Sequence, residues 1–72
     1  MNGMGVEKDI EKSIALFKES AKSGDPDAQS VLGTIFEFGI GVTKDRSTAV
    51  MYYKQAATAG NMKAKEAIKR LL

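Results

Sequence analysis

The sequence has no cysteine, no histidine and no tryptophan, and it contains a single proline. Without cysteine the chain can form neither a disulfide nor a thiolate metal site. Without histidine it lacks the commonest general base and the commonest nitrogen ligand for metals. With 72 residues it makes one domain at most, and such a short chain buries only about 60% of the surface that its unfolded form exposes. We therefore expect no catalysis, no cofactor and no metal.

Long apolar runs are also missing. No stretch approaches the roughly 20 apolar residues that span a bilayer, so we expect no membrane partner. The first residues, MNGMGVEKDI, have neither a basic region nor an apolar stretch of the kind found in signal peptides, which makes an intracellular setting the expectation. A hydrophobic content of 43% with 28% charged residues is typical of a folded domain rather than a disordered chain.

A 36-residue repeat is the main feature of the sequence. A shift of the chain by 36 positions aligns nine identical pairs without a gap. These pairs are Gly3 with Gly39, Gly5 with Gly41, Val6 with Val42, Lys8 with Lys44, Asp9 with Asp45, Lys18 with Lys54, Ala21 with Ala57, Gly24 with Gly60 and Ala28 with Ala64. A fixed period of this length indicates a repeat architecture, in which each unit is one supersecondary element.

Within each unit, apolar residues recur with the 3.6-residue period of a helix. Gly24 and Gly60 are suited to ending a helix in the left-handed conformation, and Asp25 with Pro26 is a typical helix start. Asp9, Asp45 and Asn61 are expected to begin the other helices. The sequence thus predicts an all-α fold, a short α-solenoid of antiparallel helix–turn–helix repeats with helices near 9–23, 26–38, 45–59 and 62–72.

Two glycine features of this pattern have structural explanations. The sequence Gly39-Ile40-Gly41 resembles phosphate-binding loops, but those follow a strand and carry a third glycine, so we interpret it as a turn. Gly33 lies inside a predicted helix, where glycine costs about 1 kcal/mol relative to alanine. We expect it to allow close approach of the next helix around Ala49 and Tyr53. Lys69 stands at the equivalent position of the last helix, and we interpret it as an adaptation of a capping helix, whose outer face is polar.

The string LGTIFEFGIGVTKDRSTAVMYYKQAATAGN resembles the Sel-one-like repeat, a relative of the tetratricopeptide repeat. The matching positions are Ala28, Leu32, Gly33, Phe36, Gly39, Gly41, Val42, Asp45, Ala49, Tyr52, Tyr53, Ala56, Ala57 and Gly60. The resemblance covers a complete repeat at 25–60, the second helix of a preceding repeat at about 2–24 and a C-terminal capping helix at 61–72. Ser13, Ser20 and Lys69 depart from the pattern, which prefers alanine, alanine and glycine there. The resemblance implies a right-handed superhelical scaffold that binds other proteins, in signalling, secretion-pathway quality control or bacterial–host contact.

Two sets of residues are candidates for binding. Helical repeats bind through the exposed face of the helix on the concave side, and only helix 26–38 has a neighbour on both sides. Its outward residues, predicted to contact a protein partner, are Gln29, Ser30, Thr34 and Glu37. Helix 9–23 lacks the helix that would precede it in its repeat. We therefore expect self-association through its apolar face, namely Ile14, Leu16, Phe17 and Ala21, with a two-fold dimer favoured over stacking. A fragment of a longer array is the alternative.

Other functions have weaker support. The acidic residues Glu7, Asp9 and Glu11 lack the spacing and central glycine of a calcium loop, and caps and first-turn charges explain Asp9 and Glu11 better than catalysis does. The last helix is basic through Lys63, Lys65, Lys69 and Arg70, but no aromatic residue alternates with them to stack on bases. Moreover, residues 1–36 carry four lysines and six acidic residues. Nucleic-acid binding is thus a less favoured alternative to protein binding.

Overall fold

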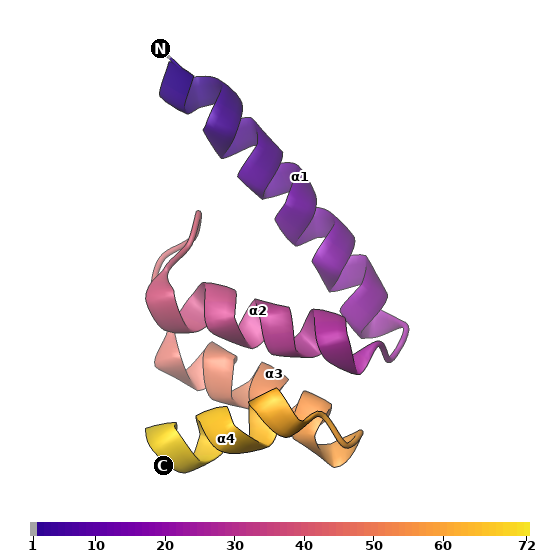
Figure 1. Ribbon diagram of the computed structural model, residues 1–72. Coiled ribbons are helices and arrows are strands. Elements are labelled where there is room, and N and C mark those ends of the chain that lie inside the picture. The colour runs from indigo at the N-terminus through magenta and orange to yellow at the C-terminus, as the bar shows by residue number, and fades with distance from the viewer. Residues whose placement is uncertain (1) are drawn as a thin grey trace.

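The computed structural model describes the backbone of residues 2–72 and the side chains of residues 9–72. Over that range the chain forms four helices and no strand: α1 (Asn2–Lys22), α2 (Pro26–Phe38), α3 (Arg46–Thr58) and α4 (Met62–Leu71). Helices α2, α3 and α4 lie side by side, whereas the N-terminal half of α1 leans away from them (Figure 1). The molecule measures 40 × 24 × 16 Å. The prediction of an all-α, short helical solenoid is confirmed.

The ends of α2, α3 and α4 follow from local side-chain chemistry. The first backbone N–H groups of a helix have no partner within it, and a side-chain oxygen just before the helix can accept from them. The carboxylate of Asp25 accepts from the N–H of Asp27 at 3.0 Å, that of Asp45 from Thr48 at 3.2 Å, and the Asn61 side-chain oxygen from Ala64 at 2.9 Å. These caps place the helix starts within one residue of the predicted positions.

The start of α1 differs from the prediction. We expected this helix to begin at Asp9, but it begins at Asn2 and Asp9 lies in its interior, although Gly3 and Gly5 align with the turn glycines Gly39 and Gly41 of the second copy. In the second copy the turn is held by α2, whose carbonyl oxygens at Ile35 and Phe36 accept from the N–H groups of Ile40 and Asp45 at 2.9 Å each. Within the described residues no helix precedes α1 to accept the equivalent bonds, and the backbone there continues as a helix.

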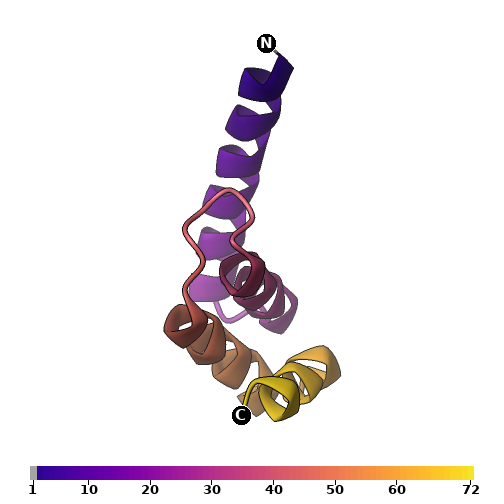
Figure 2. The same ribbon diagram turned by 90° about the vertical axis from the view of Figure 1, so that its left-hand side faces the viewer.

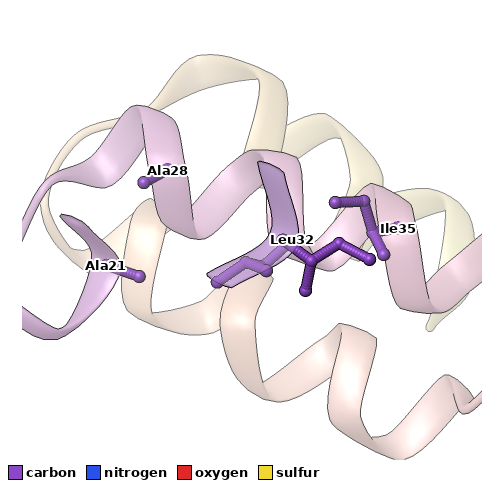
Figure 3. Close-up of a cluster of buried hydrophobic side chains, with 5 residues drawn as sticks. Ala21, Ala28, Leu32 and Ile35 are labelled. Atoms are coloured by element: carbon purple, nitrogen blue, oxygen red, sulfur yellow. The ribbon is translucent and has the colours of Figure 1, made fainter. Parts of the chain in front are cut away.

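The core consists of two clusters, each joining a helix to the one that follows it. The first joins α1 to α2 through Ile14, Ala21, Ala28, Leu32 and Ile35 (Figure 3). The second joins α3 to α4 through Ala49, Tyr53, Ala56, Ala64 and Ala67. Four of these five residues are alanines, so the backbones of α3 and α4 can approach closely. Tyr53 supplies the one large side chain of that cluster.

Helix α3 packs closely against α2 because Gly33 has no side chain. A Cβ atom at Gly33 would lie 2.6 Å from Cδ1 of the Tyr53 ring, well inside van der Waals contact. The expected reason for Gly33 is therefore confirmed for Tyr53, while its counterpart Lys69 is exposed. Gly41, with φ of +73°, turns the connector between α2 and α3 against Ile10 of α1, where a Cβ would overlap the isoleucine. Figure 2 shows this connector rising beside α1.

Candidate protein-binding surface

Gln29 and Ser30 were predicted to face outward, and that prediction is wrong. Each is only 7% exposed. The Gln29 amide nitrogen donates to the carbonyl oxygen of Ala21 at 3.0 Å, in the last turn of α1, where carbonyl groups lack partners within the helix. Helix α2 is covered by α1 on one side and by α3 and α4 on others, so its buried arc is wider than that of a helix with a single neighbour. Neither side chain is available to a partner in this structure.

Thr34 and Glu37 are half-buried and form a polar network with α3 and α4. The Tyr53 hydroxyl donates to Glu37 Oε1 at 2.7 Å, and it also lies 3.0 Å from the Thr34 hydroxyl. The Arg70 guanidinium forms a salt bridge with the same carboxylate, with Nη2 3.3 Å from Oε1. This network links three helices and ties the hydroxyl of Tyr53, whose ring lies against Gly33, to α2.

The network also sets the protonation of its members. The hydrogen bonds from Arg70 and Tyr53 lower the pKa of the Glu37 carboxyl below its ordinary value of 4.5, with burial acting in the opposite direction. Burial raises the pKa of the Tyr53 hydroxyl above its ordinary value of 10.0. At neutral pH Glu37 is therefore a carboxylate and Tyr53 a neutral donor. These states match the hydrogen bonds that the two residues make.

The exposed strip of α2 shares only Thr34 with the predicted contacts. It consists of Asp27, Val31, Thr34 and Phe38, which follow one another at intervals of four, three and four residues and so share one face. Asp27 and Phe38 are exposed, the latter at 59%, whereas Val31 and Thr34 are half-buried. Helical periodicity alone assigns Val31 and Phe38 to the buried arc. The charged residues at the equivalent positions of the last helix, Lys63 and Arg70, could have indicated the exposed face.

Helix α4 lies beside this strip of α2. The side-chain amide of Asn61 donates to Asp27 Oδ1 at 3.2 Å near the N-terminal ends of both helices. The salt bridge between Arg70 and Glu37 joins their C-terminal ends. Lys63 is exposed on α4. The strip of α2 therefore has an apolar end at Phe38 and basic side chains on the helix next to it.

A separate groove lies between α1 and α3. Its volume is about 370 Å³ and its lining residues are Lys18, Ala21, Lys22, Met51, Tyr52 and Gln55. The Tyr52 ring is stacked on Phe36 of α2, with centroids 5.9 Å apart and planes 16° apart. The Lys18 ammonium nitrogen is 6.0 Å from the centroid of the Phe36 ring. Apart from Ala21, which was assigned to self-association, none of these lining residues was among the predicted contacts.

The residues predicted for self-association do not form one exposed face. Ile14 and Ala21 are each only 6% exposed, because they pack against α2. This contradicts the expectation that they remain available. Phe17 is half-buried and Leu16 is 65% exposed. Of the four predicted residues, only Leu16 and part of Phe17 remain for contact with a second molecule.

The sequence also pointed to an acidic group near the N-terminus and to the basic last helix. Asp9 and Glu11 are exposed, and Glu7 lies outside the described side chains. Among the described residues no group of three or more acidic side chains is close enough to hold a metal ion. None of the helices described here is both long and apolar enough to cross a membrane. In the basic last helix, Arg70 forms a salt bridge with Glu37. The three lysines of this helix are exposed, namely Lys63, Lys65 and Lys69.

Comparison with known families agrees with this architecture. The model of the Sel1 repeat matches residues 1–25 and 26–61, which is most of the chain. The chain belongs to the Sel1 repeat family. Sel1 repeats generally mediate protein–protein interactions, and the family is typically a non-catalytic scaffold. Searches of curated proteins and of solved structures gave no match.

Proposed function

We propose that this Sel1 repeat chain is a non-catalytic scaffold that binds another protein through the exposed strip of α2 and the adjoining basic side chains of α4. The observation that carries the proposal is Phe38, a large aromatic side chain that is 59% exposed at the end of the strip. Aromatic residues and arginine dominate binding energy in protein interfaces. Here Phe38 lies on the face that also carries Thr34, and Arg70 extends from the next helix.

The polar network beneath this strip supports the same role. A binding surface is more effective when its residues are held in place before the partner arrives, because less conformational entropy is lost on binding. Thr34 is held by its contact with the Tyr53 hydroxyl, and Arg70 by its salt bridge with Glu37. Arg70 nevertheless keeps 55% of its side chain exposed. The strip and the adjoining Arg70 thus combine side chains held by hydrogen bonds with side chains that a partner can reach.

A selection of binding peptides tests this proposal. Displayed random 12-residue peptides would be selected on the folded chain, and the affinities of the selected peptides measured by calorimetry. Phe38→Ser should raise Kd tenfold or more, since truncation of an aromatic hot-spot residue costs about 2 kcal/mol or more and about 1.4 kcal/mol is already tenfold. Met51→Ser is the matched control, because Met51 is also an exposed large apolar side chain, at 47%, but lies on α3 away from the strip. Equal affinities for both variants would contradict the proposal.

Self-association is a second candidate, favoured by the 65% exposure of Leu16. We propose that two copies pair through Leu16 and Phe17 of α1, which makes the chain a small self-associating module. We also propose that the chain divides into the second helix of a preceding repeat at about 2–24, a complete repeat at 25–60 and a C-terminal capping helix at 61–72. In this division α1 is the second helix of its repeat, and Leu16 is uncovered by the helices of the described residues.

A further inference from the structure

The groove between α1 and α3 has the chemistry of a second binding site. We infer that it binds an extended segment of another protein in which an apolar residue stands between two acidic residues. This surface is distinct from the strip of α2, which lies on another side of that helix. Its volume of about 370 Å³ falls within the range of about 300–1,000 Å³ that is typical of ligand sites.

One wall of the groove is basic. Lys18 and Lys22 are both exposed and lie four residues apart on α1, so they project from the same face about 6 Å apart along the axis. No carboxylate is among the residues that line this groove, within the part of the chain that the structure describes. Glu11, the next acidic residue toward the start of the helix on this face, is seven residues from Lys18, about 10 Å along the axis. The wall therefore favours two negative charges.

The other wall, formed by α3, is apolar and adaptable. Met51 is 47% exposed, and the half-buried Tyr52 ring is supported from below by its stacking on Phe36. Methionine is flexible and polarizable, and it accommodates varied apolar side chains at binding surfaces. Gln55 adds a donor and an acceptor, which can pair with the backbone of a bound segment.

The interval between the two lysines fits a segment in the extended conformation. In an extended chain, successive side chains point to opposite sides, and alternate residues are about 6.6 Å apart. A segment lying in the groove would therefore place its first and third side chains toward α1 and its second toward α3. The interval of about 6.6 Å matches the interval of about 6 Å between Lys18 and Lys22. An acidic, apolar, acidic order satisfies both walls at once.

The charges and rings do not favour a nucleic acid. Only two cations line the groove, so few phosphate groups would be neutralised. The Tyr52 ring is half-buried and already stacked on Phe36, so it offers little face for a base. A protein segment with two carboxylates and an apolar residue between them can pair with both lysines and pack against the apolar wall.

The test uses a fluorescein-labelled peptide, Gly-Ser-Asp-Leu-Asp-Ser-Gly, titrated with the full 72-residue chain at low ionic strength and followed by anisotropy. Two companion peptides carry Asn-Leu-Asn or Asp-Ser-Asp at the centre, and a twelve-residue thymidine oligonucleotide represents nucleic acid. The Asp-Leu-Asp peptide should bind at least fivefold more tightly than each companion and more tightly than the oligonucleotide. Tighter binding of the oligonucleotide, or equal binding of the three peptides, would overturn the inference.

Variants then locate the site. Lys18→Gln with Lys22→Gln should weaken binding of the Asp-Leu-Asp peptide at least fivefold, and Met51→Ser at least threefold. Lys65→Gln with Lys69→Gln removes the same charge from exposed positions of α4 and should change the affinity less than twofold. Phe38→Ser should also leave it unchanged. Circular dichroism checks the fold of each variant. Equal losses for the two lysine pairs would show attraction to net charge only, and the inference would be wrong.

Discussion

Helices α1 and α3 occupy equivalent positions in the repeat, yet their side chains are in different surroundings. Helix α3 packs against α2 on one side and α4 on the other, whereas α2 is the only described helix that packs against α1. Ala49, Tyr53 and Ala56 of α3 are at most 2% exposed. Their counterparts in α1 are an exposed serine, a half-buried phenylalanine and another exposed serine: Ser13, Phe17 and Ser20. The same repeat position is thus core in one helix and surface in the other.

This comparison shows that substitutions in a repeat follow the neighbours of each helix. Serine in place of alanine adds a hydroxyl, which needs a hydrogen-bond partner when buried but can bond to water when exposed. Lys69, in place of Gly33, follows the same logic at the other end of the molecule, since no helix packs over it in this structure. The departures from the repeat pattern therefore lie at the two outer faces, where they cost little.

The largest expected effect comes from overfilling the contact between α2 and α3. Gly33→Leu should lower the free energy of unfolding by over about 2 kcal/mol, because even a Cβ atom would overlap the Tyr53 ring. The polar network with Thr34 and Glu37 holds that ring in place, so it cannot move aside without further loss. Lys69→Leu, at the equivalent exposed position, should have little effect. Urea denaturation of both variants measures the difference, and equal midpoints would contradict the packing argument.

A smaller effect is expected when the serines of α1 and the alanines of α3 are exchanged. Ala56→Ser should destabilise the fold by about 1 kcal/mol, because Ala56 is fully buried and the new hydroxyl would lose its contact with water. Ser20→Ala should change stability by no more than about 0.5 kcal/mol, as is usual for exposed positions. Thermal unfolding followed by circular dichroism compares the two. Equal changes in the free energy of unfolding for the two substitutions would contradict the argument that burial makes alanine necessary in α3 and not in α1.

The salt bridge between Glu37 of α2 and Arg70 of α4 should make the stability of the fold depend on pH. The folded-state pKa of Glu37 is lowered by Arg70 and Tyr53, so its contribution to stability is present above the unfolded-state value near 4.5. That contribution is lost as the pH falls through the lower folded-state value. Glu37→Gln should reduce the loss of stability on acidification below about pH 4.5. Urea midpoints from pH 7 down to pH 3 measure this, and parallel profiles for wild type and variant would contradict it.

The smallest effect on stability is expected at the exposed face of α1. Leu16→Glu should change the free energy of unfolding by less than about 0.5 kcal/mol, since the side chain is 65% exposed. Its effect should appear in assembly instead. We expect sedimentation of the wild type at rising concentration to show a dimer, and the variant to remain a monomer. Monomers in both cases would mean that the uncovered face of α1 is tolerated and that the self-association proposal is wrong.

The sequence alone determined the number of helices, most of their boundaries and the repeat that relates them. Caps and left-handed glycines act over a few residues, so Asp25, Asp45 and Gly60 could be assigned from local chemistry. The reason for Gly33 could also be foreseen, because an unfavourable helix residue in a repeat implies close packing. The family resemblance is confirmed by the match over residues 1–25 and 26–61.

The tertiary structure alone decided which faces are buried, and the candidate sites depend on this. Helical periodicity marks one apolar arc, but α2 has neighbours on more than one side, so Gln29 and Ser30 became interior and Phe38 remained exposed. The helix start predicted at Asp9 was wrong, and the turn at the equivalent position of the second copy is held by backbone bonds to Ile35 and Phe36 of α2. The groove between Lys18 and Met51 combines residues that lie far apart in the chain. Such contacts depend on how the helices pack together, and no local pattern in the sequence encodes that geometry.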